Sequence, residues 1–183
     1  QARVRTREEA LAAFAEFGGV PCVLEAMLDL KKELSVVMAR GLDGKCAVFP
    51  VATNVHHEGI LAITTVDTTP VSLTKEATEA ALAIARGLDY HGVLCVEFFV
   101  VGDGQLIVNE IAPRPHNSGH YSIEACDFSQ FDTHILGVLR SPLPAIQLHA
   151  PAVMLNVLGQ HVEAAEKYVT ENPSAHLHMY GKI

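Results

Sequence analysis

Two glutamates stand inside an apolar segment, VEFFVVGDGQLIVNE, that otherwise has the pattern of a β-hairpin: Glu97 and Glu110. Between them, Asp103-Gly104 is the dipeptide that two-residue type I′ turns prefer, because both central residues of that turn need positive φ. Counting outward from such a turn places Glu97 directly opposite Glu110. The sequence therefore predicts two carboxylates facing each other on paired strands.

Such an arrangement needs something that offsets the repulsion between the two charges. Opposed residues of an antiparallel pair have Cβ atoms about 4.5 to 5.5 Å apart, and like charges there are destabilising. A proton, an arginine or a divalent cation could each offset it, and oxygen ligands suit Mg²⁺ best. We therefore interpret Glu97 and Glu110 as metal ligands, with Asn109 as a further oxygen donor at the strand end.

The alternative is that both glutamates point to solvent from an exposed face of the sheet. Against it, Cys95, Phe99 and Val101 share the face of Glu97 by the alternation of side chains along a strand, so that face is apolar. Mg²⁺ held by two carboxylates usually completes its shell with water and phosphate oxygens. A nucleotide is the expected third partner.

Further carboxylates upstream could serve the rest of a nucleotide. Glu25 and Glu33 flank the connection in VLEAMLDLKKELS. A nucleotide cleft needs backbone groups for the adenine edge and a carboxylate for the ribose hydroxyls, which a strand end at Glu25 and the later Glu33 could provide. Taken alone, these residues are more often solvated loop charges.

Histidines gather in NVHHEG (54–59) and in RPHNSGH (114–120), which raises zinc as an alternative. However, the chain has no H-E-x-x-H motif and no Cys/His pairing at ligand spacing. Four residues that follow the second glutamate closely fit better as hydrogen-bond donors toward an anion near a transferring phosphate: Arg114, His116, Asn117 and Ser118. A polar loop that caps the next helix would have the same spacing.

Composition limits the class of protein. The chain has 183 residues, 49% of them hydrophobic, and a formal net charge of −8. It contains no apolar run of the length a membrane span needs, and its acidity disfavours a broad nucleic-acid-binding face. Its four cysteines are widely spaced without a C-x-x-C, as in proteins with reduced thiols. We expect a cytoplasmic protein without nucleic-acid or membrane partners.

The elements that must position these residues alternate between strands and helices. Helical spacing covers 7–17, 73–88 (with Ser72 or Thr74 as N-cap), 129–139 and 162–169. Strand patterns cover 22–28, 33–41, 45–52, 60–67 and 151–159, besides the glutamate hairpin. Hairpins separated by helices predict an α+β fold with a mostly antiparallel sheet flanked by helices.

In this order, these segments resemble the ATP-grasp superfamily, and within it the N5-carboxyaminoimidazole ribonucleotide synthase family. The most specific stretch is the E-x-F of the hairpin with NEIAPRPHNSGH (109–120), followed by SQF (129–131). ARGLDGK and FPVATNVHHEGIL also match the family pattern. The resemblance covers essentially the whole chain.

The resemblance implies a role for each matching residue. Glu97 and Glu110 would bind Mg²⁺, while Arg114, His116 and Asn117 would face bicarbonate, the carboxyphosphate intermediate and the ribonucleotide. The remaining positions would bind ATP: Glu25, Ala26, Met27 and Leu28 on the adenine side, Glu33 at the ribose, His56 at the nucleotide site, and Asn109 with Glu110 on the phosphate side.

The same resemblance implies the reaction and the domain organisation. Such enzymes carboxylate 5-aminoimidazole ribonucleotide with bicarbonate and ATP in purine biosynthesis, commonly as homodimers. Residues 1–30 would complete the small lobe, 31–140 would form the large lobe, and 141–183 would begin a C-terminal domain. The family pattern extends beyond both ends, so these residues are expected to be a catalytic core that is inactive alone.

Other functions stay open at this point. A sister ATP-grasp enzyme, such as a formate-dependent glycinamide ribonucleotide transformylase or a biotin carboxylase, would share the two glutamates but not the P-H-N-S-G-H loop. A non-catalytic nucleotide-binding or dimerisation module would bind Mg²⁺-ATP without bicarbonate-dependent ADP release. A zinc hydrolase would retain stoichiometric zinc.

Overall fold

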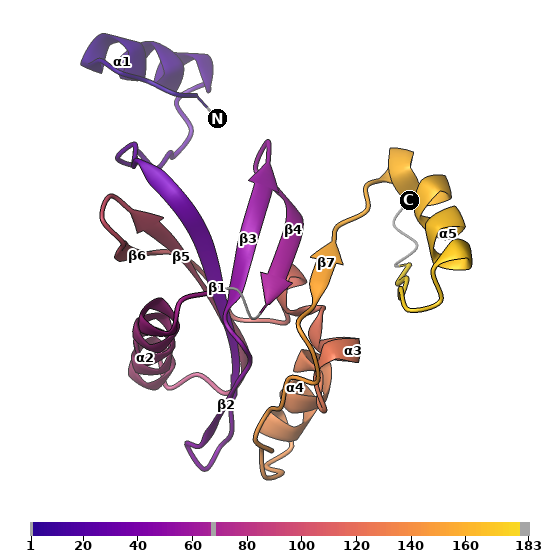
Figure 1. Cartoon of the computed structure of the whole chain (residues 1–183). Coiled ribbons are helices and arrows are strands. Elements are labelled where there is room, and N and C mark those ends of the chain that lie inside the picture. Colours follow the sequence, from indigo (N-terminus) through magenta and orange to yellow (C-terminus); the bar gives the residue numbers. More distant parts are fainter. Residues whose placement is uncertain (1, 67–68, 180–183) are drawn as a thin grey trace.

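The computed structural model describes residues 2–66 and 69–179, and its centre is an antiparallel sheet (Figure 1). The strands are β1 (Leu30–Arg40), β2 (Cys46–Val48), β3 (Ala52–His57), β4 (Ile60–Val66), β5 (Gly92–Val101), β6 (Gln105–Ala112) and β7 (Val153–Leu155). Their order is β6-β5-β1-β3-β4-β7, with β2 paired to the end of β1. The predicted α+β fold with an antiparallel sheet is confirmed.

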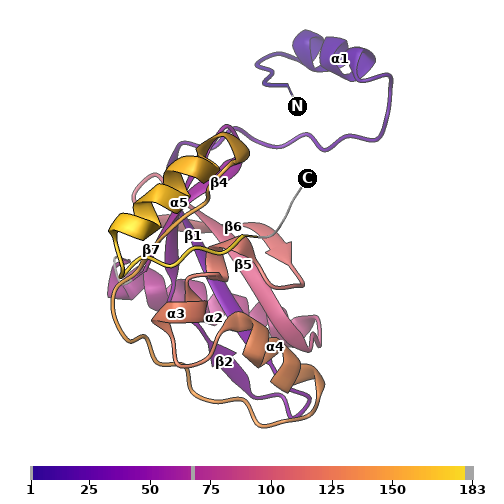
Figure 2. The same ribbon diagram turned by 90° about the vertical axis from the view of Figure 1, so that its right-hand side faces the viewer.

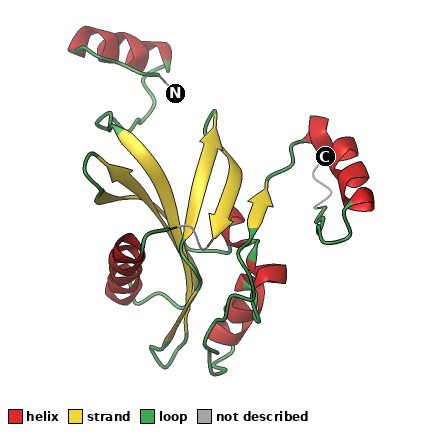
Figure 3. Ribbon diagram, in the orientation of Figure 1, coloured by secondary structure: helices red, strands yellow, loops and turns green. Residues whose placement is uncertain are grey.

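Helices cover both faces of this sheet (Figure 3). They are α1 (Arg7–Glu16), α2 (Val71–Gly87), α3 (Ser122–Ala125), α4 (Gln130–Val138) and α5 (Val162–Glu171), with 3-10 turns η1 (Asn117–Gly119) and η2 (Gly159–His161). Helix α2 packs on one face of β1 and β5, while α3 and α4 lie on the other. Alternate residues of the central strands therefore enter two separate cores.

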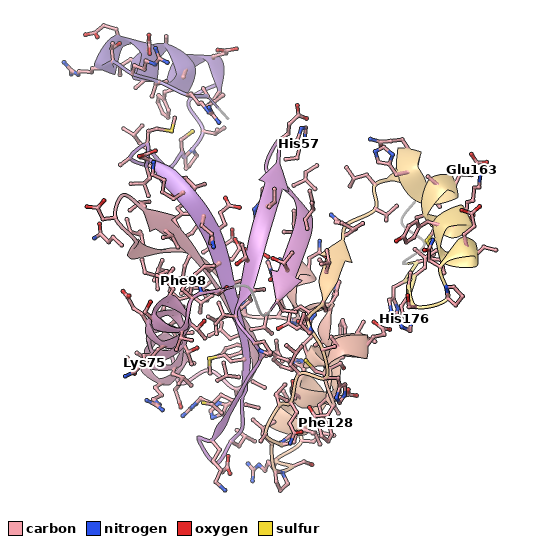
Figure 4. The ribbon with its side chains drawn as sticks, in the orientation of Figure 1. His57, Lys75, Phe98, Phe128, Glu163 and His176 are labelled. Carbon is pink, nitrogen blue, oxygen red and sulfur yellow. The ribbon has the colours of Figure 1, made fainter. Side chains whose placement is uncertain are left out.

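The face under α2 is closely packed because the helix presents alanines to it. Ala77, Ala81 and Ala85 recur every four residues and are fully buried against β1 and β5. Phe98 lies on this side of the sheet, next to α2 (Figure 4). The small alanine side chains let α2 lie close to the sheet.

The start of α2 differs from the prediction. The helix begins at Val71 with Pro70 as its N-cap, and no side chain caps it. The predicted caps, Ser72 and Thr74, lie inside the first turn, where the Thr74 hydroxyl donates to the Pro70 carbonyl at 3.1 Å. Proline fixes φ near the helical value and has no N–H to satisfy, so it can open a helix without a capping side chain.

The opposite face carries α4, whose predicted range is confirmed. Ser129 and Asp132 form a reciprocal capping box at its start. Gly137 lets the helix approach the sheet, because a Cβ there would lie 3.2 Å from the Arg40 carbonyl oxygen and 3.4 Å from the Gly92 Cα. The helix thereby fixes the loop that precedes it, which carries several candidate site residues.

Three of the predicted strands are shorter or absent. The run 22–28 has no strand partner among the described residues and is largely exposed, and regular pairing begins only at Leu30. The run 45–52 is interrupted at Phe49–Val51, around Pro50, and only three residues of 151–159 form β7. Hydrophobic composition without a partner does not make a strand, because the backbone groups need a ladder. The end of the predicted strand 60–67, at Asp67, lies outside the described residues.

The two ends of the chain project from this body. Figure 2 shows α1 at a distance from the sheet, joined to β1 by an extended segment, and Figure 1 shows α5 beyond β7. Within residues 2–66 and 69–179, no helix combines the length and the apolar character that crossing a membrane requires.

Candidate nucleotide and metal site

Glu97 and Glu110 face each other in the structure, as predicted. They are paired Cα to Cα across β5 and β6, and Ser35 pairs with Glu97 on the other side. The Glu97 side chain is only 13% exposed, whereas Glu110 is exposed. One carboxylate of the pair, Glu97, is therefore buried beside the polar residue Ser35, and the other, Glu110, is at the surface of the sheet.

The predicted turn is wrong, although the pairing it predicted is right. Val101 pairs with Gln105, so the hairpin loop has three residues, Gly102–Gly104, instead of two. A β-bulge then places one extra residue, Asn109, on β6 between the partners of Glu97 and Phe98. The extra loop residue and the bulge compensate each other and bring the two glutamates opposite.

The bulge also directs a side chain to the site. Burial raises the pKa of Glu97, and the Asn109 side chain is near enough to its carboxylate to act against this shift. Bulges often re-aim a side chain in this way next to functional sites. Asn109 is thus part of the same constellation as the two glutamates.

The environment of Glu97 disfavours an isolated negative charge. Burial is the main cause of its raised pKa, and the nearby carboxylates of Glu110 and Glu33 raise it further, while His56 and Asn109 act in the opposite direction. A carboxylate in this position gains from a cation beside it. Among the described residues, no group of three or more His, Cys, Asp or Glu side chains converges as a metal cluster. A Glu97–Glu110 ion would need further ligands from elsewhere, as Mg²⁺ bound to phosphate does.

Glu33 and His56 form a second pair near this patch. They lie on the neighbouring strands β1 and β3, and the His56 Nδ1 is hydrogen-bonded to a Glu33 carboxylate oxygen. Both side chains are mostly buried. Both residues act electrostatically on Glu97, so the two residues predicted at the nucleotide lie close to it.

His116 approaches Glu97 from the loop after β6. Its Nε2 lies 3.3 Å from the Glu97 Oε1. Burial, followed by the Arg114 charge, lowers the pKa of His116 to about 4, so the ring is neutral near pH 7. Because the ring is neutral, this close polar contact is not an ion pair.

Gln130, at the start of α4, holds the backbone of this loop. Its fully buried side chain accepts from the His116 N–H and donates to the His116 carbonyl, both at 2.8 Å. Gly119 leaves room for it, since a Cβ there would lie 2.7 Å from the Gln130 Oε1. Helix α4 thus sets the position of His116.

Comparison with known proteins decides the family. The family model of the ATP-grasp domain matches residues 1–131. The chain belongs to the ATP-grasp family. A second model, the phosphoribosylaminoimidazole carboxylase C-terminal domain, matches residues 152–183 of this ATP-grasp chain.

Individual relatives carry a narrower name. The chain is 49% identical over 162 residues to an N5-carboxyaminoimidazole ribonucleotide synthase of Staphylococcus aureus (strain COL), covering 88% of this chain and 43% of the relative. The structure of the Staphylococcus aureus N5-carboxyaminoimidazole synthetase with ADP superposes with a TM-score of 0.89 at 44% identity, over 98% of this chain and 49% of that chain. The structure of an Aspergillus clavatus N5-carboxyaminoimidazole synthase in complex with ADP and 5-aminoimidazole ribonucleotide superposes with a TM-score of 0.74 at 32% identity. The match covers 79% of this chain and 41% of that chain. The chain spans about half the length of the relatives it matches.

Two further predicted residues, Arg114 and Asn117, are close to His116 in the sequence. Arg114 is exposed and its guanidinium donates to the Pro115 carbonyl at 3.0 Å, while Asn117 opens η1. Both are on the loop that carries His116, and of these three residues His116 is the one that lies 3.3 Å from the Glu97 carboxylate.

The predicted adenine segment is separate from the cluster. Glu25, Ala26, Met27 and Leu28 have irregular backbone before β1, and only Leu28 is half-buried. Part of this segment lines a surface hollow of about 510 Å³ together with the start of α1. The structure connects it to the cluster only through β1, which begins beside it and carries Glu33.

Several buried polar residues beside the site were missed in the sequence. They are Ser35, Asn54, Thr64 and Gln130, all nearly inaccessible to solvent. Ser35 and Asn54 interrupt otherwise apolar stretches at inward positions of their strands, and that interruption is the signal that could have identified them.

Proposed function

We propose that this chain forms the ATP-binding catalytic part of an N5-carboxyaminoimidazole ribonucleotide synthase. The reaction would carboxylate 5-aminoimidazole ribonucleotide with bicarbonate and convert ATP to ADP and phosphate. The observation that carries the proposal is the Glu97–Glu110 pair with the His116 Nε2 at 3.3 Å from the Glu97 Oε1. The matching relatives, among them a protein in complex with ADP and 5-aminoimidazole ribonucleotide, support the choice of substrate.

The carboxylate pair fits Mg²⁺ in charge and in ligand type. Glu97 and Glu110 would hold the ion, which would neutralise charge on the transferring phosphoryl group when bound. Asn109, whose side chain is near the Glu97 carboxylate, would supply a further polar group beside the ion. Glu33, held by His56, would bind the ribose hydroxyls of ATP, and the exposed segment 25–28 would contact adenine.

The loop after β6 would bind the carboxyl donor. Arg114 is exposed and free to reorient its guanidinium toward an anion, and Asn117 follows the neutral His116. A bicarbonate oxygen would attack the γ-phosphorus as ADP leaves, which forms carboxyphosphate. The amine of the ribonucleotide would then attack the carboxyl carbon, and phosphate would leave.

The proposal includes an organisation for the whole protein. Residues 1–30 would belong to the small lobe that closes over ATP, 31–140 to the large lobe, and 141–183 to the start of a C-terminal domain. We further propose a cytoplasmic homodimer. The 183 residues alone would not turn over, because the rest of the small lobe must cover the phosphates.

An ADP-release assay on the full-length protein tests this function. We expect ADP formation that depends on both bicarbonate and 5-aminoimidazole ribonucleotide. Release with glycinamide ribonucleotide and formate instead would identify a sister ATP-grasp enzyme. Binding of Mg²⁺-ATP without bicarbonate-dependent release would identify a nucleotide-binding module, and either result would overturn the proposal.

A further inference from the structure

A chain of buried hydrogen bonds crosses the sheet and ends at the candidate site. Thr64 on β4 donates its hydroxyl to the Asn54 Oδ1 at 2.9 Å. The Asn54 amide on β3 donates to the Ser35 Oγ on β1 at 2.9 Å, and Ser35 donates to the Ser118 Oγ in η1 at 2.8 Å. All four side chains are at most 5% exposed. We call Thr64, Asn54, Ser35 and Ser118 the buried relay.

The donor and the acceptor of each hydrogen bond in the buried relay can be assigned. Ser35 accepts from the Asn54 N–H, so its own hydroxyl hydrogen is the one shared with Ser118. The Ser118 hydroxyl accepts that hydrogen and must direct its own to the His116 Nδ1, 2.8 Å away. Cys95 Sγ, at 3.9 Å from the Ser118 Oγ, is a weak partner and does not compete.

The last member fixes the histidine. The Ser118 backbone N–H also donates to the His116 Nδ1, at 3.3 Å. With two donors at Nδ1, a neutral ring carries its hydrogen on Nε2, which lies 3.3 Å from the Glu97 Oε1. The opposite tautomer would place the Nε2 lone pair against the carboxylate.

We propose that the buried relay is a set of positioning residues that fixes the His116 tautomer with its hydrogen on Nε2, the ring nitrogen that lies 3.3 Å from the Glu97 Oε1. The inference rests on the proposed function in one respect, since Glu97 is there a ligand of Mg²⁺. An N–H at this distance from one carboxylate oxygen, in place of a lone pair, stabilises the charge of Glu97 and leaves the other oxygen for the ion, as partners outside the ligand shell commonly do. Residues on three strands that never touch substrate would thereby set the geometry of the metal ligand.

Ring ¹⁵N spectra of ¹⁵N-histidine-labelled full-length protein test the tautomer directly. His116 would be assigned from the signal that His116→Gln removes. We expect the pattern of a neutral ring protonated at Nε2. An Nδ1–H ring in the unsubstituted protein would overturn the proposal, whatever reaction the enzyme catalyses.

Asn54→Asp replaces the donor to the Ser35 hydroxyl by an acceptor, and the two side chains have almost the same shape. A carboxylate at 54 accepts from Ser35, so Ser35 no longer donates to Ser118 and the Ser118 hydroxyl turns away from His116. We expect signal from the Nδ1–H tautomer and at least a tenfold loss of kcat. Asn156→Asp is the matched control, because Asn156 donates to the Leu61 carbonyl outside the relay, at 2.7 Å. That control should keep the tautomer of the unsubstituted protein.

Thr64→Val covers the case in which Asn54→Asp does not fold. It removes only the donor that orients the Asn54 amide, so the amide can rotate and reverse the relay, and we expect a mixture of tautomers. Spectra of Thr64→Val, and of Asn54→Asp where it folds, that match the Asn156→Asp control would overturn the relay. Absence of bicarbonate-dependent turnover in the unsubstituted protein would overturn the proposed function but leave the tautomer result valid.

Discussion

The metal end and the adenine end of the candidate site are built differently. Around Glu97, each approaching side chain is held by another part of the chain: Asn109 by a bulge, and His116 by Gln130 and the relay. In residues 20–29, by contrast, the backbone is irregular and apolar side chains face solvent, with Met27 72% exposed. The metal end is preorganised by the fold, and the adenine end is not.

This difference has a thermodynamic consequence. Buried polar groups cost free energy unless they are paired, so changes at the metal end affect stability and function together. Exposed side chains contribute little to the folded state, so changes at the adenine end can affect binding alone. Substitutions at the two ends should therefore give distinct patterns of stability and nucleotide affinity.

The largest effect is expected from Glu110→Gln, which should weaken Mg²⁺-dependent ADP binding by about 100-fold or more. Loss of an outer partner alone costs about 10- to 100-fold in metal affinity, and a direct ligand should cost at least as much. The free energy of unfolding should stay the same or rise by about 0.5 kcal/mol or less, because the charge opposite Glu97 is gone. Calorimetry with and without Mg²⁺ and urea unfolding measure the two quantities.

Glu76→Gln is the control for this change, since Glu76 is exposed on α2 and the substitution removes the same charge. It should leave ADP affinity unchanged. If Glu110→Gln instead lowers stability and keeps Mg²⁺-dependent binding, the pair is structural and the preorganised metal end is wrongly assigned.

A smaller effect, on the order of 2 kcal/mol, is expected in the pH dependence of stability at His116. Its pKa is lowered from 6.5 to about 4 in the folded protein, mainly by burial. Between pH 6.5 and about 4, His116 is therefore protonated in the unfolded chain but not in the folded protein. The free energy of unfolding should fall as the pH drops from 6.5 toward 4, and this contribution should be fully present only above that window.

Urea unfolding of the unsubstituted protein and His116→Gln at about pH 7.5 and pH 5 isolates the contribution, since most carboxylates titrate alike in both. The His116→Gln variant should lose less stability between the two pH values. The raised pKa of Glu97 acts with the opposite sign, because a folded state that binds the proton more readily gains stability as the pH falls. His57→Gln, at the exposed tip of the β3–β4 hairpin (Figure 4), is the control. Equal losses in His116→Gln and the unsubstituted protein would mean that the His116 ring is not protected.

What the sequence could predict follows the range of the interactions. The strong periodicity of 73–88 and the capping pattern at Ser129 are local, and both helices are found close to their predicted bounds. The prediction that Glu97 faces Glu110 is right although the predicted two-residue turn is wrong, because the bulge at Asn109 offsets the extra residue of the loop. Bulges depend on the partner strand, so a single strand's sequence does not contain them.

Non-local contacts account for the rest. The relay joins residues up to 83 positions apart, and no spacing rule connects Ser35 with Ser118. The opposite error concerns 22–28, where apolar composition predicted a strand that has no partner among the described residues. Apolar composition indicates that a segment tends to be buried, but it does not identify the strand or helix against which the segment packs.

The smallest effect on stability, and the sharpest separation of the two ends, is expected from Met27→Ala. Because the Met27 side chain is 72% exposed, its truncation should change the free energy of unfolding by less than about 0.5 kcal/mol. If the segment contacts adenine, the variant should lose apolar contact with the base, and the Kd for ADP should rise about 3- to 10-fold. Leu139→Ala, an exposed apolar truncation at the end of α4, should change neither quantity appreciably. Calorimetry and urea unfolding on all three proteins would decide the matter: a stability loss above about 1 kcal/mol without a change in Kd would mean that the segment supports the fold rather than the nucleotide.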